Sequence, residues 1–263
     1  MMQGTVFRPA PLQVFFVISC FRDLRRHPVH QNEMIRPEPA LLSLLHLCDS
    51  LFPIGSFAYS DGLESAAASG LVTGIADLRQ WLEIGLEEGF GRSDGPSIVL
   101  AWSAVEATDW EAVVAIDEEL TALRPSSTAR MANRSMGLRL LKTWHGLHPD
   151  VRLEHMLALV HARRLGPALP VAFAAAAYCG GIALRDALAG YAYARLAATV
   201  SAAMRLVAIG QTDAHGLLSL TLARVPSAID GVLARQARPE SFAPALDIAQ
   251  MSQQYLHARL FRS

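Results

Sequence analysis

The segment Ala58-Tyr-Ser-Asp-Gly62 is one residue away from the Gly-x-Ser-x-Gly turn that presents the nucleophile of many serine hydrolases. In those enzymes a strand precedes the serine and a helix follows it, whereas the residues before Ser60 follow a leucine-rich helical pattern. Asp213 and His215 could supply an acid and a base, but two residues of one turn do not have triad geometry. Serine is also a preferred N-cap residue, so we expect Ser60 to cap a helix. A helical hydrolase that uses Ser60 with His215 stays as the alternative function.

Other residues that could carry chemistry lack the spacing that chemistry needs. His145 and His148 lie three apart at a predicted helix end, where they could bind a transition metal weakly or simply face solvent. The sequence contains neither HExxH nor a Cys–His cluster. Adjacent glutamates such as Glu87-Glu88 point about 100° apart on a helix and do not form an acid–base pair. We therefore predict no catalytic residue, no metal site and no cofactor.

The composition excludes further classes of function. Lys142 is the only lysine among 23 basic residues, so no phosphate-binding Gly-x-x-x-x-Gly-Lys-Ser/Thr loop exists. The net charge of −1 gives no general attraction to nucleic acid or to an anionic membrane. Hydrophobic residues make up 52% of the chain, which favours either burial in partner proteins or a membrane segment. Three scattered cysteines imply no disulfide framework, and we expect a cytoplasmic protein.

One uncharged stretch, residues 165–184, is long enough to span a membrane. Pro167, Pro170 and the Gly180-Gly181 pair interrupt it, and its many alanines drive membrane insertion only weakly. A buried core helix over about residues 170–179 is therefore favoured. We expect no membrane contact.

The first residues differ from the rest of the chain. An apolar run over residues 11–20 precedes its basic cluster, which is the reverse of the order in a signal peptide. We interpret residues 1–37 as a disordered or spurious leader, with the hypothesis that Met34 is the biological start. Residues 38–263 are predicted to form the folded domain.

Helical periodicity dominates residues 38–263, and no segment shows the alternation of a half-buried strand. Capping signals include Ser126 and the sequence Asp61-Gly-Leu-Glu64, which resembles a capping box. Short connections predict a single-domain, all-α bundle of about ten helices without a significant sheet. The helices are expected over about residues 39–48, 61–69, 109–123, 127–145, 150–162, 168–179, 185–210, 213–223, 227–237 and 244–258, with one more after Asp77.

The last segment of the sequence, SFAPALDIAQMSQQYLHARLFRS, ends in an unusual way. A predicted helix is followed by Arg259-Leu-Phe-Arg262, in which two apolar residues stand between arginines. Apolar and aromatic residues flanked by arginine are typical of interface anchors. The alternative is a tail that folds back on its own core, because chain ends fray unless they are docked.

Four segments together resemble the urease accessory protein F (UreF) family. They are LCDSLFPIGSFAYSDGLESAAASGLV near the start, RSMGLRLL in the middle, VSAAMRLVAIGQTDAHGLL later and SFAPALDIAQMSQQYLHARLFRS at the end. Their order and spacing agree from about Leu41 to Ser263. The resemblance implies an all-helical homodimer without catalytic activity, which binds the accessory protein called D or H and recruits the GTPase accessory protein G. This assembly delivers nickel to apo-urease, and the family protein is implied to modulate GTP hydrolysis by its partner.

The resemblance also implies where partners bind. The turn with Phe57 and Tyr59 is expected to be exposed to a partner or to the second protomer. The Gln211-Thr-Asp213 segment is expected to end the long helix near such a surface. The end of the chain is expected to dock on the D/H protein, with Phe261 as the apolar anchor, through Tyr255, Arg259, Leu260, Phe261 and Arg262.

Overall fold

Short polar side chains and prolines set where several helices begin. The Ser126 hydroxyl accepts a hydrogen bond from the Ala129 N–H, as predicted, and the Asp150 carboxylate accepts one from the Arg152 N–H. Such bonds satisfy N–H groups that the first turn of a helix leaves unpaired. Proline occupies the first turn of α5, α9, α12 and α13, where its missing N–H would have had no partner.

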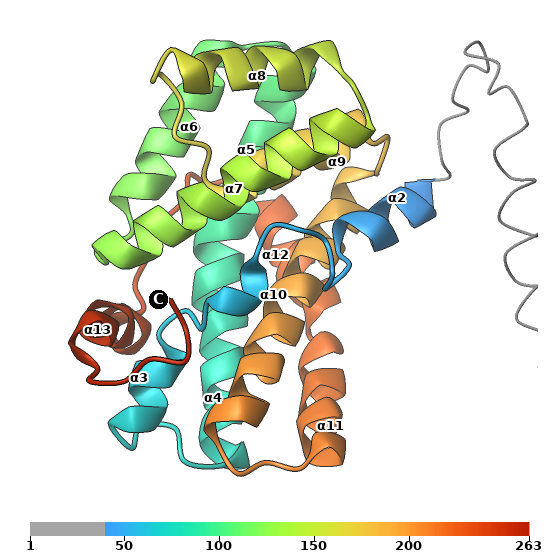
Figure 1. Ribbon diagram of the computed structural model, residues 1–263. Helices are drawn as coiled ribbons and strands as arrows, with labels where there is room; N and C mark the ends of the chain where they lie inside the picture. Colours follow the sequence, from blue (N-terminus) through green and yellow to red (C-terminus); the bar gives the residue numbers. More distant parts are fainter. Residues whose placement is uncertain (1–39, 263) are drawn as a thin grey trace, which may run out of the picture. The chain divides into compact units, whose positions relative to one another are not determined.

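The computed structural model describes residues 40–262, and Figure 1 shows their arrangement. The predicted all-α class is confirmed, because no strand occurs among these residues. A π-helical segment, η2 (Gly85–Asp94), and two 3₁₀ turns, η1 (Ser56–Ala58) and η3 (Gln253–Tyr255), accompany the α-helices. The leader predicted for residues 1–37 lies outside the described residues. The α-helices are α2 (Ala40–Leu47), α3 (Leu63–Ala68), α4 (Ile75–Ile84), α5 (Gly95–Glu106), α6 (Trp110–Ala122), α7 (Ser127–Leu147), α8 (Val151–His161), α9 (Leu169–Cys179), α10 (Leu184–Leu206), α11 (Gln211–Leu222), α12 (Val225–Arg235) and α13 (Pro244–Ser252).

Helix α9 lies at the centre of the core, with α5 and α7 packed along it (Figure 1). Every residue from Leu169 to Ala177 is buried, and the alanines among them allow neighbouring helices to approach closely. The approach is tightest at Gly137 of α7, where an added Cβ atom would lie 2.0 Å from the Pro167 carbonyl oxygen. The uncharged stretch that could have spanned a membrane is thus a buried core helix, as predicted.

The first N–H groups of α9 are bound by side chains from other helices. Asp117 of α6, which is 1% exposed, accepts a hydrogen bond from the Ala168 N–H at 2.6 Å. Asn133 of α7 accepts one from the Leu169 N–H at 2.7 Å. Burial raises the pKa of Asp117 to about 6, although the bond from Ala168 works in the opposite direction. The central helix therefore begins at a carboxyl group whose ionisation costs folding free energy.

The residues from Ile75 to Glu106 form α4, η2 and α5 in unbroken succession. No end is predicted for the helix after Asp77, and no separate helix is predicted over residues 95–106, where Gly95 and Pro96 are typical helix breakers. The structure places the π-helix at this point. A π-helix is rare, and where it occurs it often marks a functional region.

Two predicted helix ends are wrong. The long helix α10 ends at Leu206, because Val207 has extended backbone angles, so Gln211 and Asp213 begin α11 and do not end the long helix. The last helix, α13, ends at Ser252 and passes through η3 to Leu256, whose extended backbone turns the chain back toward α3.

Within the described residues, the stretch Gln211–Arg235 is long and apolar enough to cross a membrane by length and composition. Only 33% of its most apolar window is buried. The stretch is divided between α11 and α12 by a turn at Ala223 and Arg224. It therefore forms an apolar, partly exposed pair of short helices.

The buried carboxyl at the start of α9 predicts a pH-dependent stability. The unfolded value of 3.8 lies below the folded value of about 6, so the contribution of Asp117 is fully present below the unfolded pKa and is lost as pH rises through about 6. This difference corresponds to about 3 kcal/mol. Asp117→Asn keeps an oxygen for the Ala168 N–H and removes the charge, and should therefore be more stable than wild type at pH 7.5.

Urea unfolding of both chains at pH 4.5 and pH 7.5 measures the effect. The gain from Asp117→Asn should shrink at the lower pH, where the wild-type carboxyl is protonated. A variant that is less stable than wild type at pH 7.5 would contradict this account.

Candidate functional site

The two most distinctive segments of the sequence, Leu51–Glu64 and Ser241–Arg262, pack against each other. Figure 1 shows the end of the chain, in red, lying beside α3, in cyan. Helix α13 contacts both α3 and α7. Its backbone comes so close to Gly62 that a Cβ atom added there would lie 2.8 Å from the Gln250 nitrogen. We call the surface formed by these two docked segments the composite surface.

Glu64 holds the end of the chain to α3. Its side chain is buried, with the residue 7% exposed, and its carboxylate accepts hydrogen bonds from the backbone N–H groups of Leu260 and Phe261. The Gln253 side-chain amide donates a third bond at 2.7 Å. A buried carboxylate needs such partners, because an ionised group without them is strongly destabilising. The N-terminal segment thus supplies the acceptor and the C-terminal segment supplies the donors.

Two further contacts hold the end of the chain, residues 255–262, which we call the tail. The Arg262 N–H donates to the Ala58 carbonyl oxygen at 2.7 Å. The Phe261 side chain is 3% exposed, and the guanidinium of Arg205 on α10 lies 4.4 Å from the centre of its ring, as in a cation–π contact. Phe261 therefore anchors the tail to its own chain, which is the alternative to the expected partner anchor.

Other residues of the same surface point outward. Tyr255 is 78% exposed, Leu260 is 62% exposed, and Phe57 is 44% exposed. Arg259 and Arg262 are also exposed, whereas Tyr59 is half-buried and packs against the core. An apolar surface with arginines at its edge is therefore offered by the docked tail and the turn at Phe57.

The structure does not bring every expected residue to this surface. Gln211 and Asp213 are exposed at the start of α11. Figure 1 shows α11 on the other side of α4 and α10 from α13. The two expected regions of partner contact are thus separate regions of the molecule.

Ser60 is part of the docking contact. It is 3% exposed, and its hydroxyl donates to the Gln253 side-chain oxygen at 3.3 Å and accepts from the Glu64 N–H at 3.4 Å. The predicted capping role of Ser60 is supported by this second bond, although the residue before the first helical residue is Gly62. The predicted capping box is wrong, because Glu64 binds the tail and Asp61 pairs with Arg195 of α10.

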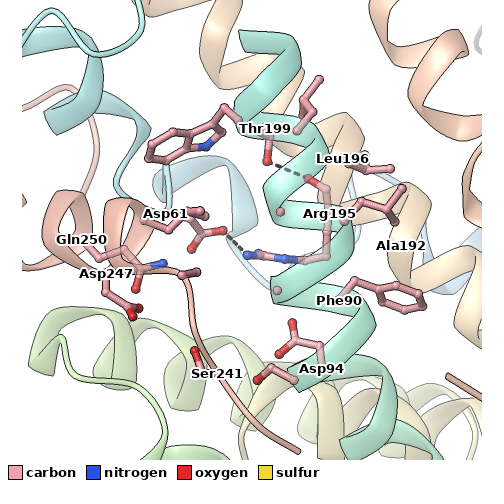
Figure 2. A pocket seen from close by; sticks show the side chains of 18 of the residues that line it. Asp61, Phe90, Asp94, Ala192, Arg195, Leu196, Thr199, Ser241, Asp247 and Gln250 are labelled. Carbon is pink, nitrogen blue, oxygen red and sulfur yellow. Dashed lines mark hydrogen bonds and ion pairs between the residues drawn. The ribbon is translucent and has the colours of Figure 1, made fainter. Parts of the chain in front are cut away.

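A cavity of about 120 Å³ lies under the C-terminal segment. Figure 2 shows its walls, with Asp61 and Arg195 on one side and Ser241, Asp247 and Gln250 of the C-terminal segment on another. Asp94, at the end of η2, also lines it. Burial raises the pKa of Asp247, and the nearby Arg124 partly offsets that effect.

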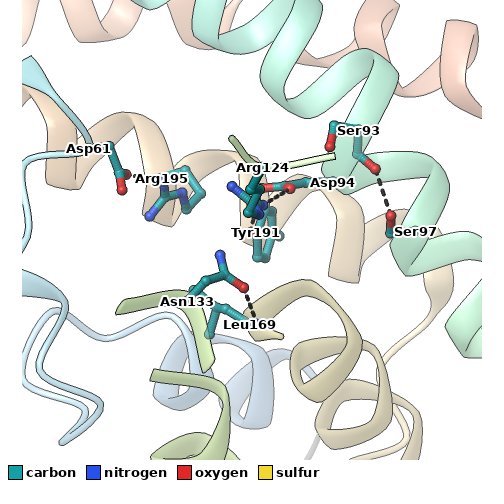
Figure 3. A network of polar contacts seen from close by, with 9 residues as sticks. All are labelled: Asp61, Ser93, Asp94, Ser97, Arg124, Asn133, Leu169, Tyr191 and Arg195. Carbon is teal, nitrogen blue, oxygen red and sulfur yellow. Dashed lines mark hydrogen bonds and ion pairs between the residues drawn. The ribbon is translucent and has the colours of Figure 1, made fainter. Parts of the chain in front are cut away.

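Partly buried ion pairs line this cavity (Figure 3). Asp94 accepts a bond from Arg124 at 2.6 Å and another from the Tyr191 hydroxyl at 2.7 Å. Burial, followed by the Asp94 carboxylate, raises the pKa of Tyr191 well above its ordinary value, so the phenol remains a donor. Burial disfavours the charge on Arg195, but Asp61, Tyr191 and Asp94 together outweigh burial and raise the pKa of that guanidinium. Asp94 and Asp61 thus each pair with an arginine that is distant along the chain.

The geometry gives no support to a metal site in the described residues. No group of three or more His, Cys, Asp or Glu side chains there is placed to hold a metal ion. The two histidines considered as a weak metal pair have separate surroundings. The Asp150 N–H donates to the ring of His145, whereas the His148 ring lies 4.3 Å from that of Trp144 and 6.4 Å from that of His46.

Several residues of the site are not predicted from the sequence. Gln253, Arg205, Arg195 and Asp94 act through partners that are distant along the chain, and no local spacing signals their roles. Glu64 does stand in a conspicuous motif, but its position in a first helical turn suggests a cap. A cap and a tail anchor use the same chemistry, a carboxylate that accepts hydrogen bonds from backbone N–H groups, so only the fold distinguishes them.

The fold and the site together define an all-helical protein whose two signature segments form one surface. A profile described as UreF matches residues 72–220 of the chain. The urease accessory protein UreF of Methylibium petroleiphilum is 32% identical over 85% of this chain and 94% of that protein. The UreF proteins of Bacillus sp. strain TB-90 and Sinorhizobium medicae are 30% and 36% identical, each over 85% of this chain and over 99% and 96% of their own lengths. The chain belongs to the UreF family of urease accessory proteins.

The contact between Gly62 and α13 predicts that the composite surface depends on a glycine. Gly62 has a φ of +87°, and Gly70 has a φ of +77° with nothing within 4 Å of an added Cβ. Alanine strains the backbone at both positions, but only Gly62→Ala also pushes against α13. Limited trypsin digestion should release the C-terminal segment roughly tenfold faster from Gly62→Ala than from wild type, as expected for the loss of one or two docking contacts.

Gly70→Ala is the matched control, and its C-terminal segment should be cleaved at close to the wild-type rate. Equal cleavage rates for the two variants would show that docking does not depend on the space at Gly62.

Proposed function

We propose that this protein is a non-catalytic adaptor in urease maturation. It binds the D/H accessory protein through the composite surface and recruits the GTPase accessory protein G, whose GTP hydrolysis it modulates. The assembly delivers nickel, as cargo, to apo-urease in the cytoplasm. Membership of the UreF family supports the coarse role, and the composite surface supports the adaptor role.

The observation that carries the proposal is that some groups of the tail face inward and others face outward. Phe261 and the backbone N–H groups of residues 260 and 261 face inward and fix the tail, while Leu260 and Tyr255 face outward. A segment that is fixed on one side and apolar on the other loses little conformational entropy when a partner covers it. The exposed arginines at its edge suit an acidic rim on the partner.

We further propose that a second copy of the chain binds at an apolar groove of about 820 Å³ beside α2, α10 and the turn at Phe57. Small residues of α10, among them Ala194, Ala197 and Ala198, line the groove. The neighbouring α2 exposes Leu41, Leu42 and Leu45. A small-residue groove beside a row of exposed leucines is self-complementary, which is the requirement of a two-fold dimer interface. Phe57 lines this groove, so the dimer would cover the turn at Phe57 and leave the docked tail as the part of the composite surface that binds the D/H protein.

Substitutions on the outward side of the tail should separate binding from folding. Leu260→Asp and Arg259→Ala change exposed side chains and leave the Glu64 contacts in place, so the thermal stability should stay at the wild-type value. Affinity for the D/H protein should fall about tenfold or more for Leu260→Asp, as for an apolar interface residue. Isothermal titration with D/H protein, followed by nickel-dependent activation of apo-urease, measures both consequences.

Val151→Asp on α8 is the control, because Val151 is an apolar residue that is 73% exposed, compared with 62% for Leu260. Phe261→Ala should weaken D/H binding as well, but together with faster proteolysis of the tail. If Leu260→Asp binds D/H with wild-type affinity and supports urease activation, the composite surface is not the D/H site.

The dimer proposal has a separate test. Ala198→Arg places a charged side chain in the groove and should convert the protein to a monomer in sedimentation velocity, with an unchanged helical circular dichroism spectrum. Ala107→Arg, at an exposed position after α5, should leave the oligomeric state unaltered. A dimer that survives Ala198→Arg would place the dimer interface elsewhere.

A further inference from the structure

The chain also contacts the π-helix η2 immediately before the C-terminal segment. Between α12 and α13 the chain crosses η2 as an irregular strap, residues 236–243. The Glu240 N–H donates to the Arg92 carbonyl oxygen at 2.9 Å, and the Arg92 guanidinium pairs with the Glu240 carboxylate at 3.0 Å. Just before the strap, the Arg235 guanidinium donates to the Gly91 carbonyl oxygen at 2.6 Å.

These bonds meet a need that the sequence of η2 creates. At the end of the π-helix the Gly95 N–H bonds to the Phe90 carbonyl, five residues back. The next residue, Pro96, has no N–H, so it cannot bond to the next carbonyl, that of Gly91. The Arg235 guanidinium donates to the Gly91 carbonyl in place of the missing N–H, and the Glu240 N–H donates to the next carbonyl, that of Arg92. Strap and π-helix thus complete each other's hydrogen bonds.

The far end of the same segment is the tail on Glu64. Between these two ends α13 covers the cavity, whose opposite wall includes Phe90, Ser93 and Asp94 of η2. The Ser126 hydroxyl donates to the Gln250 carbonyl and ties α13 to the start of α7. A continuous series of contacts therefore runs from Phe261 through α13 and the strap to Arg92.

We propose that the strap, the C-terminal segment and the π-helix η2 form one conformational unit. Undocking of the tail from Glu64 loosens the strap, which exposes the carbonyl of Arg92 and destabilises the π-helical turn that carries Asp94. A partner that engages the tail thereby acts on η2. Only this last step rests on the proposed adaptor function, since the coupling itself belongs to the isolated chain.

Hydrogen–deuterium exchange of the isolated full-length chain tests the coupling. Glu64→Ala and Phe261→Ala each remove one tail anchor, on opposite sides of the tail. Loss of one or two strap bonds should raise amide exchange in residues 86–94 about 5- to 30-fold. Asp150→Ala, which removes a helix cap at α8, is a matched control for local destabilisation and should leave residues 86–94 at the wild-type rate.

The reverse experiment uses Arg235→Leu, which removes the donor to Gly91 without touching the tail. Because coupling is reciprocal, exchange of the Leu260 and Phe261 amides should rise in this variant. The proposal is overturned if the tail amides lose protection in either tail variant while residues 86–94 keep wild-type rates. That outcome would leave D/H binding by wild type intact, so it is distinguishable from failure of the adaptor function, which the Leu260→Asp titration tests.

Discussion

The buried side chain of Glu64 determines how the C-terminal tail lies on the Leu51–Glu64 segment. A buried polar group requires hydrogen-bond partners, and here the partners are backbone N–H groups of the tail and the Gln253 amide. Because those donors lie on one short segment, satisfying the carboxylate also places Phe261 inward and Leu260 outward. The hydrogen bonds that Glu64 requires thus determine which side chains of the tail face outward on the composite surface.

Other parts of the fold also depend on hydrogen bonds and ion pairs between elements that are distant along the chain. Helix α9 begins at side chains of α6 and α7, the π-helix is completed by Arg235 and the strap, and Asp61 pairs with Arg195 of α10. In each case a group that local structure leaves unpaired receives a partner from another part of the chain. The glycine at position 62 is needed for a related reason, since α13 can approach only where no side chain intervenes.

Local features of the fold could be predicted from the sequence, and distant pairings could not. The cap at Ser126, the buried helix around residues 170–179 and the absence of strands in the described part follow from short patterns of residue type. The π-helix does not, because glycines and Pro96 look like helix breakers until groups from α12 and the strap are known. The end of α10 is also missed, since its apolar periodicity continues past Val207 although the backbone does not. At the site, the tail and the Phe57 turn are recognisable from their composition. The inward direction of Phe261 and the role of Glu64 depend on contacts that no local pattern records.

The link between Glu64 and Phe261 joins residues that are 197 apart in the sequence. Closing so long a loop costs conformational entropy that only the intervening structure can reduce, by holding the two ends near each other beforehand. Contacts of this range are opposed by the entropy of loop closure and slow the folding of a chain. The docked tail therefore depends on α4 to α12 to bring Glu64 and Phe261 near each other. A partner that recognises the docked tail therefore binds folded molecules in preference to molecules in which the tail is not docked.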